Sequence, residues 1–244
     1  MTKSAIVAHF SALDRPTDVR HGIAHDLGLA IVSGQLPPGT PLLSEERYSA
    51  ENGVSRGAYR EALRILAGKG LIQNRLKSTT LVNERVKWSM LDLDVLGWMF
   101  ENGPRRAFVE SIFELRGIVE PSAAGLAAAR RNDRELARMG HALENMERYG
   151  LRDERGRAAD QAFHLAILTA TRNEPLMTLS SSIAAAVEWT TRFARDEQKS
   201  DRDPMPDHHA VFTALVEKDG LLARNAMEIL IKNALSDASI TNQM

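Results

Sequence analysis

The chain has 244 residues, 43% of them hydrophobic, so it is long enough to bury a core as one large domain or two modest ones. It contains no cysteine, which excludes disulfides and thiolate metal sites, and no apolar run approaches the roughly 20 residues of a membrane span. The N-terminus "MTKSAIVAHFSALD" lacks the long apolar core of a signal peptide, so we expect a cytoplasmic protein.

The net charge of −1 conceals an asymmetry along the chain. Residues 1–90 carry 12 Lys and Arg against 8 Asp and Glu, whereas residues 91–244 carry 19 against 24. A basic segment followed by an acidic body indicates a polyanion-binding module joined to a part with another role. Scattered surface charge is the alternative explanation.

The N-terminal part predicts three helices and a hairpin. Apolar residues at every fourth position indicate a helix over 18–33, and Ser44 can cap a short second helix. Ser55 can cap a third helix over 56–69, which Gly70 closes. Two strand-like runs, "LIQNR" and "TLVN", follow. This order is typical of a winged helix-turn-helix.

The third predicted helix carries Arg56, Arg60 and Arg64 on a face away from its apolar side. The first two lie in its N-terminal turns, the part of a recognition helix that reaches base edges, where guanidinium groups pair with guanine or phosphate. A solvated arginine face accounts for the same spacing equally well.

The stretches "SGQLPPGTPLLSEE" and "NGVSRGAYREALRILAGKGLI" resemble the DNA-binding domain of the GntR family of bacterial transcription regulators. In two places the chain departs from the family pattern: Glu46 stands where the second helix usually has an Arg, with Arg47 one place later, and Thr79 stands where the wing usually has Gly. The resemblance implies contacts with operator DNA, which we predict for Ser55, Arg56, Arg60, Arg47, Arg64, Lys77 and Thr80.

We expect three parts: a winged helix-turn-helix over 1–83, a connector over 84–104 and a helical domain over 105–244. The connector "VKWSMLDLDVLGWMF" is similar to that of regulators of sugar-acid operons, and its apolar side chains predict packing rather than a loose linker.

The remainder of the chain reads as helix. Phe108, Ile112, Leu115 and Val119 form one apolar stripe, with a kink expected at Pro121. Further helices are expected over 133–149, 154–171, 174–197, 206–218 and 220–237. This pattern predicts a mainly α fold with an all-α antiparallel bundle at the C-terminal end. The bundle resembles the FCD domain of the FadR subfamily, which implies effector binding and dimerisation.

Asp160 and His164 in "DQAFH" lie one helical turn apart on one face. The spacing alone fits a metal site, an acid/base pair or two solvated side chains. The FCD resemblance implies a divalent metal, such as zinc, nickel or manganese, held by Asp160, His164 and His208. The resemblance also places Leu230 where a fourth ligand, a histidine, is usual, so water or an effector oxygen must complete the coordination.

Two further residues are effector-site candidates. By the resemblance, Arg116 faces the effector cavity, where a guanidinium suits a carboxylate, although an i,i+4 pair with Glu120 explains it as well. Asn173 is a second candidate, with turn chemistry before Glu-Pro as its alternative. The effector is expected to be a small carboxylate such as a sugar acid or hydroxy acid.

An enzyme and a helical adaptor without a ligand are the competing classes. "HD" at 25–26 and "DHH" at 207–209 are similar to phosphohydrolase motifs, but neither has the surrounding strands or further ligands, and a phosphate loop and a nucleophile elbow are missing from the sequence. An adaptor would leave the Asp/His set unexplained. We therefore predict a homodimeric, ligand-responsive repressor that is not an enzyme.

Overall fold

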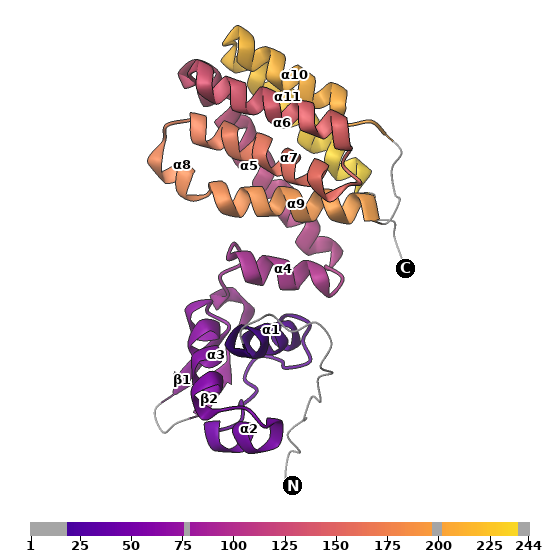
Figure 1. Cartoon of the computed structure of the whole chain (residues 1–244). Helices are drawn as coiled ribbons and strands as arrows, with labels where there is room; N and C mark the ends of the chain where they lie inside the picture. Colours follow the sequence, from indigo (N-terminus) through magenta and orange to yellow (C-terminus); the bar gives the residue numbers. More distant parts are fainter. Residues whose placement is uncertain (1–18, 76–78, 197–201, 239–244) are drawn as a thin grey trace. The chain divides into compact units, whose positions relative to one another are not determined.

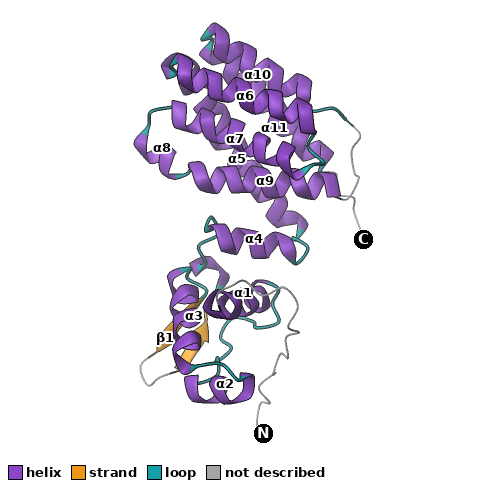
Figure 2. Ribbon diagram, viewed as in Figure 1, coloured by secondary structure: helices purple, strands orange, loops and turns teal. Residues whose placement is uncertain are grey.

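The structure, a computed structural model, describes residues 19–75, 79–196 and 202–238. The chain divides into two compact units, Met1–Asn102 and Gly103–Met244 (Figure 1). Helices dominate both units, and the strands belong to the first (Figure 2). The predicted mainly α fold is confirmed.

The first unit contains the predicted three helices: α1 (Val19–Val32), α2 (Glu45–Asn52) and α3 (Arg56–Gly68). Both predicted N-caps are confirmed, because the Ser44 hydroxyl accepts a hydrogen bond from the Arg47 amide and the Ser55 hydroxyl accepts one from the Ala58 amide. Gly53 ends α2 in a left-handed conformation, with φ of 65°. The core of this unit is formed by side chains of α1 and α3: Ile23, Leu27, Ile31, Tyr59, Ala62 and Leu66.

The hairpin follows α3 as predicted. Strands β1 (Ile72–Arg75) and β2 (Thr79–Val82) pair antiparallel, with Ile72 opposite Val82 and Arg75 opposite Thr79. The segment before α2 extends the pairing through a bridge between Pro41 and Leu81. The predicted DNA contact Lys77 lies outside the described residues.

The connector is attached to the first unit through α4 (Leu93–Glu101), which packs on α1. Before α4, η1 (Arg85–Lys87) forms a single 3-10 turn. The Asp92 side chain caps α4 and also accepts a hydrogen bond from Lys69 Nζ, just beyond α3, at 2.7 Å. Trp98 lies so close to α1 that a Cβ on Gly28 would stand 2.4 Å from its ring. The connector is therefore a packed element rather than a loose segment up to Asn102.

The second unit consists of α5 (Arg106–Arg130), α6 (Asp133–Tyr149), α7 (Glu154–Ala170), α8 (Glu174–Thr178), α9 (Ser180–Asp196), α10 (Met205–Glu217) and α11 (Gly220–Asp237). Helix α11 packs along α5, and their backbones approach closely where a Cβ on Gly125 would lie 3.0 Å from the Gly220 carbonyl oxygen. Helix α7 packs against α5, α6 and α9, so its inner face lies in the core of the bundle (Figure 1). No described helix has the length and apolar character required to cross a membrane.

The predicted single helix over 174–197 is wrong in one respect, because the chain turns at Leu179 and forms α8 and α9. The hydroxyls on either side of the break donate to backbone carbonyls, Thr178 to Pro175 and Ser180 to Met177. Such local hydrogen bonds offer the backbone an alternative to a continuous helix. The expected kink residue, Pro121, lies within α5, which continues through it.

Replacing Gly28 with Ala is expected to destabilise the first unit by about 1–3 kcal/mol, because the added methyl group has no room beside the buried Trp98 ring. Urea denaturation followed by circular dichroism measures the effect. Gly68→Ala is the matched control, since nothing lies within 4 Å of a Cβ there and alanine favours the helix. Equal midpoints for the two variants would contradict the packing of α4 on α1.

Candidate functional site

A small cavity lies inside the second unit, between α5, α7, α9, α10 and α11, and is partly open to solvent. Its wall combines apolar and charged side chains. The ionisable and hydroxyl side chains that line it are Arg116, Asp160, His164, Thr190, Thr191, Arg202, His208 and Asp237. A buried concave surface with convergent polar groups is the usual form of a small-molecule site.

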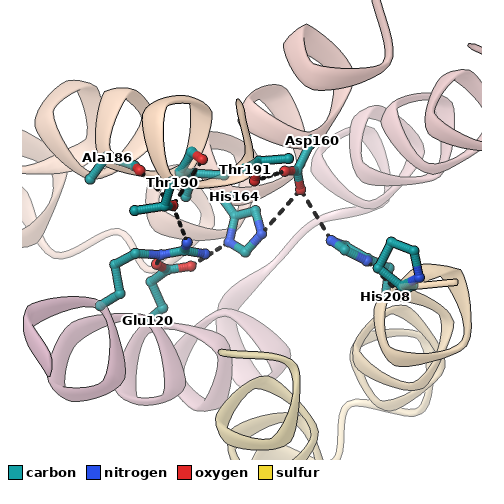
Figure 3. Close-up of polar contacts among 10 residues, drawn as sticks. Glu120, Asp160, His164, Ala186, Thr190, Thr191 and His208 are labelled. Carbon is teal, nitrogen blue, oxygen red and sulfur yellow. Dashed lines mark hydrogen bonds and ion pairs between the residues drawn. The ribbon is translucent and has the colours of Figure 1, made fainter. Parts of the chain in front are cut away.

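Asp160, His164 and His208 come together at this cavity, as the sequence resemblance implied (Figure 3). Asp160 and His164 stand one turn apart on α7, and His208 reaches them from the first turn of α10. Asp160 Oδ1 lies 3.1 Å from His208 Nε2 and 3.4 Å from His164 Nε2. All three side chains are buried, and their three candidate ligand atoms lie within 4.8 Å of one another.

The outer nitrogens of the two imidazoles are already engaged. His164 Nδ1 contacts the Glu120 carboxylate, and His208 Nδ1 lies 2.9 Å from the Pro204 carbonyl oxygen. Both partners are acceptors, so each Nδ1 carries the proton and each Nε2 points toward Asp160. This second contact to a carboxylate or carbonyl is typical of metal-ligating histidines.

The inner nitrogens need a cation. His164 Nε2 is buried and has no hydrogen-bond partner among the described residues. In a neutral histidine this Nε2 presents a lone pair to the Asp160 carboxylate, and two acceptors facing each other at this range repel. A divalent metal ion or an added proton on the ring removes the repulsion. The residues present therefore fit a divalent ion with two nitrogen ligands and one oxygen ligand.

Glu120 is a site residue that the sequence analysis considered only as a partner of Arg116. Its Oε1 accepts a hydrogen bond from Arg116 Nε at 2.7 Å, while Oε2 contacts His164 (Figure 3). Arg116 Nη1 also donates to the Thr190 hydroxyl at 2.7 Å. Arg116 thus lines the cavity and also forms the i,i+4 pair with Glu120, while its role toward an effector stays a prediction. A signal was present in the sequence: Phe113, Arg116 and Glu120 share one face of α5.

The charges in this cluster depend on one another. Burial opposes the charged form of Glu120, yet Arg116 and His164 outweigh it and lower the pKa of that carboxyl to about 2. Burial likewise favours neutral His164, but the Glu120 and Asp160 carboxylates raise its pKa to about 9. The pKa of Asp160 falls below its usual range despite burial, because both imidazoles face it.

Of the other residues that the sequence analysis named for the second unit, Leu230 lines the cavity and Asn173 does not. Leu230, at the expected fourth ligand position, is buried and forms an apolar part of the cavity wall. Asn173 does not line the cavity: its side chain accepts a hydrogen bond from the Leu176 amide and caps α8, which is the turn chemistry named as its alternative. The sequence analysis also missed Thr190, Thr191, Arg202 and Asp237 in the lining. Arg202 and Asp237 lie 35 positions apart and pair only in the folded chain.

The phosphohydrolase-like motifs do not assemble as sites. In "DHH", Asp207 binds Arg202, whereas the adjacent His209 is exposed and contacts Glu147, so it points away from His208. In "HD", His25 Nε2 lies 3.2 Å from Glu101 at the surface of the first unit. Neither motif brings together the ligands of a metal-dependent hydrolase.

The first unit presents the predicted DNA-contacting arginines on its surface. Arg56, Arg60 and Arg64 have exposed side chains on α3, yet each is paired with a glutamate. Arg60 makes two hydrogen bonds to Glu45 of α2, and Arg56 Nη1 lies 3.1 Å from Glu46, the residue that departs from the family pattern.

The remaining predicted contacts lie around α3. Arg64 pairs with Glu61 on the same helix, and Arg47 pairs with Glu51 on α2. Thr80 lies on β2, opposite Asn74 in the register. The Ser55 hydroxyl serves as the N-cap of α3.

Comparison with known proteins gives two family matches: residues 20–82 match the model described as bacterial regulatory proteins, gntR family, and residues 111–233 match the FCD domain. The galactonate operon transcriptional repressor of Escherichia coli is 34% identical, over 85% of this chain and 91% of that protein. The HTH-type transcriptional regulator LutR of Bacillus subtilis is 29% identical, over 81% and 90%. The structure of Lar from Listeria monocytogenes, 19% identical, shares the fold with a TM-score of 0.62 over 96% of this chain and all of that one.

The raised pKa of His164 has a consequence for stability. In protein kept free of metal by a chelator, the free energy of unfolding should be greatest below about pH 6.5 and fall as the pH rises through 9, because the native state holds a proton that the unfolded state releases near 6.5. Melting temperatures from pH 6 to 10 measure this loss. The loss of stability with rising pH should be smaller in His164→Gln and unchanged in His209→Gln, because His209 is exposed. The same pH profile in both variants would contradict the assignment to His164.

Proposed function

Because the chain belongs to the GntR family of bacterial regulatory proteins and joins that domain to an FCD domain, we propose that this ligand-responsive, DNA-binding transcription regulator represses an operon for the catabolism of a sugar acid or related organic acid. The observation that supports an acid as the effector is the cavity, which is lined by both Arg116 and a buried Asp/His/His trio. The proposed place of action is the cytoplasm, and the proposed chemistry in the cavity is binding without bond breaking.

Operator recognition is assigned to the N-terminal turns of α3. Arg56 and Arg60 are exposed there and can pair bidentately with guanine or with phosphate. In the free protein Glu45 and Glu46 occupy these guanidinium groups, so DNA must displace two carboxylates to gain the contacts. The first unit, over its described residues, offers one such helix per subunit, so we propose a homodimer that reads two half-sites of a palindrome.

Effector binding is assigned to the cavity on grounds of charge. Asp160 and Glu120 contribute two negative charges and Arg116 one positive charge, so the cluster with neutral histidines has a net charge of −1. A bound divalent ion, for which we propose zinc, nickel or manganese, would supply positive charge and open coordination positions for an effector oxygen. Arg116 would then orient the carboxylate of the acid, a task that suits a guanidinium held at a fixed angle by Glu120 and Thr190.

The experiment that tests this function is release from DNA. A fragment selected from a random pool by the wild-type protein should contain an inverted repeat, and a small organic acid from a screened panel should release it in a mobility-shift assay. Failure of every acid, with release by an acyl-CoA or an amino acid instead, would overturn the effector class. A selected sequence without an inverted repeat would count against the homodimer.

Arg60→Ala is expected to weaken binding of the selected fragment about tenfold or more, because it removes a bidentate contact, and affinity should fall steeply with salt. Glu45→Gln should instead strengthen binding a few-fold, because it frees Arg60 and removes a negative charge facing DNA. Glu101→Gln, the same change where the partner is His25, is the control and should leave binding unchanged. Wild-type affinity in Arg60→Ala would show that α3 is not the recognition helix.

Zinc titrated by calorimetry into chelator-treated protein should bind more tightly when the releasing acid is present, since each ligand raises the affinity for the other. Binding should weaken as the pH falls below about 9, because the raised pKa of His164 lets protons compete with the ion for its imidazole. His164→Ala should abolish binding, whereas Leu230→His, which adds the fourth ligand, should tighten it on the order of tenfold. His209→Ala is the control. Identical titrations for wild type and His164→Ala would show that the trio holds no metal.

A further inference from the structure

The cavity has a second charged cluster, formed by Arg202, Asp237 and Asp207. Arg202 lies just before α10, and its Nε and Nη2 donate to Asp237 Oδ2 at 2.9 and 2.6 Å. Its Nη1 donates to Asp207 Oδ2 at 2.7 Å, and Asn233 donates to the same oxygen. Arg202 and Asp237 line the cavity, and the exposed fraction of the Asp237 side chain is only 9%. Neither residue was expected from the sequence to take part in binding.

This cluster and Arg116 stand at opposite ends of one chain of contacts. Arg116 binds Glu120, which contacts His164; Asp160 then lies between the two histidines. His208 follows and reaches the carbonyl of Pro204, two residues beyond Arg202. Among the described contacts, the two arginines share no partner. Along this chain of contacts the Asp/His/His trio lies between the two arginines, and both arginines line the cavity.

An apolar wall joins the two ends. Leu230, Ala234 and Asp237 all line the cavity from one face of α11, and this face spans two helical turns, about 10 Å. Leu230 and Asp237 stand at the two ends of this face of α11. A two- or three-carbon acid bound at the trio would leave the far end unused, whereas a longer chain would extend along this wall toward Arg202 and Asp237.

The two ends differ in charge. At the Arg116 end, a divalent ion held by Asp160, His164 and His208 would change the net charge of that cluster from −1 to +1. This charge matches one carboxylate of an effector. At the other end, among the side chains that the structure describes, one guanidinium faces two carboxylates, Asp237 and Asp207, and this excess of negative charge disfavours a further anion. A hydroxyl group meets no such penalty, because it can donate to a carboxylate oxygen and accept from the guanidinium at once.

We propose that Arg202 and Asp237 form a hydroxyl-binding subsite that selects a polyhydroxy monocarboxylic acid and rejects the dicarboxylic acid of the same carbon skeleton. This inference rests on the proposed effector function and adds to it the class of acid. Arg202 and Asp237 are specificity-determining residues in this scheme, and the carboxylate of the ligand lies at the other end, beside Arg116.

The test compares carbon-matched acids on the full-length protein. Calorimetry with zinc present measures the dissociation constants of galactonate and gluconate, of their dicarboxylic counterparts galactarate and glucarate, and of glycolate as the short acid. Wild type should bind at least one of the two monocarboxylates about tenfold or more tighter than its dicarboxylic counterpart, and tighter than glycolate.

Asp237→Asn is the diagnostic variant, because the amide keeps the shape and the hydrogen bond to Arg202 but removes the charge. This variant should reduce the ratio of the dicarboxylate and monocarboxylate dissociation constants, mainly because it binds the dicarboxylate more tightly than wild type does. Asp219→Asn is the matched control: it carries the same change at the other end of α11, outside the cavity lining, where asparagine also caps a helix. Asp219→Asn should keep the wild-type ratio of the dicarboxylate and monocarboxylate dissociation constants.

The outcomes separate the subsite from the proposed function. Equal affinity of wild type for monocarboxylate and dicarboxylate, an unchanged ratio in Asp237→Asn, or tightest binding by glycolate would overturn the subsite and leave an acid-responsive regulator. Binding of none of these acids, together with no release of DNA by any acid, would overturn the proposed function itself. Retained selectivity in Asp219→Asn with lost selectivity in Asp237→Asn is the result that supports the subsite.

Discussion

The second unit is organised around the cost of burying charge. Asp160 and Glu120 are almost fully removed from water, and an isolated buried carboxylate costs several kcal/mol even after relaxation. Each is compensated by a group on its own helix and by groups from other helices. Glu120 faces Arg116 on α5 and His164 on α7, and Asp160 faces His164 on α7, His208 on α10 and the Thr191 hydroxyl on α9. The helices that supply these groups are therefore fixed in place by electrostatics as well as by apolar packing.

The same compensation connects ligand binding to the fold. The groups that would hold an ion and an acid come from α5, α7 and α10, with Thr190 of α9 supporting Arg116. A ligand that changes the charge in the cavity changes the interactions that hold these helices together. A small acid can thus favour one packing of the bundle over another in proportion to its difference in affinity for the two. No separate transmitting element inside this unit is required.

The sequence predicted the features that depend on local chemistry. Caps at Ser44 and Ser55, the hairpin and the helices follow from short-range patterns, and so does the one-turn spacing of Asp160 and His164. What it could not supply were pairings set by tertiary packing, such as Arg202 with Asp237. The break at Leu179 was missed because apolar periodicity continues across it and only the flanking hydroxyl bonds mark it.

The double role of Asp92 has a mechanical consequence for the first unit. One carboxylate caps α4 and also binds Lys69 at the end of α3, while α1 packs against both helices. Tilting α4 away from α3 would break the contact between Lys69 and Asp92 or pull the Asp92 carboxylate off the α4 amides that it caps. Helices α3 and α4 are thus tied to each other through Asp92 and Lys69 and to α1 by packing, so the connector up to Glu101 and the exposed arginines of α3 belong to one packed body.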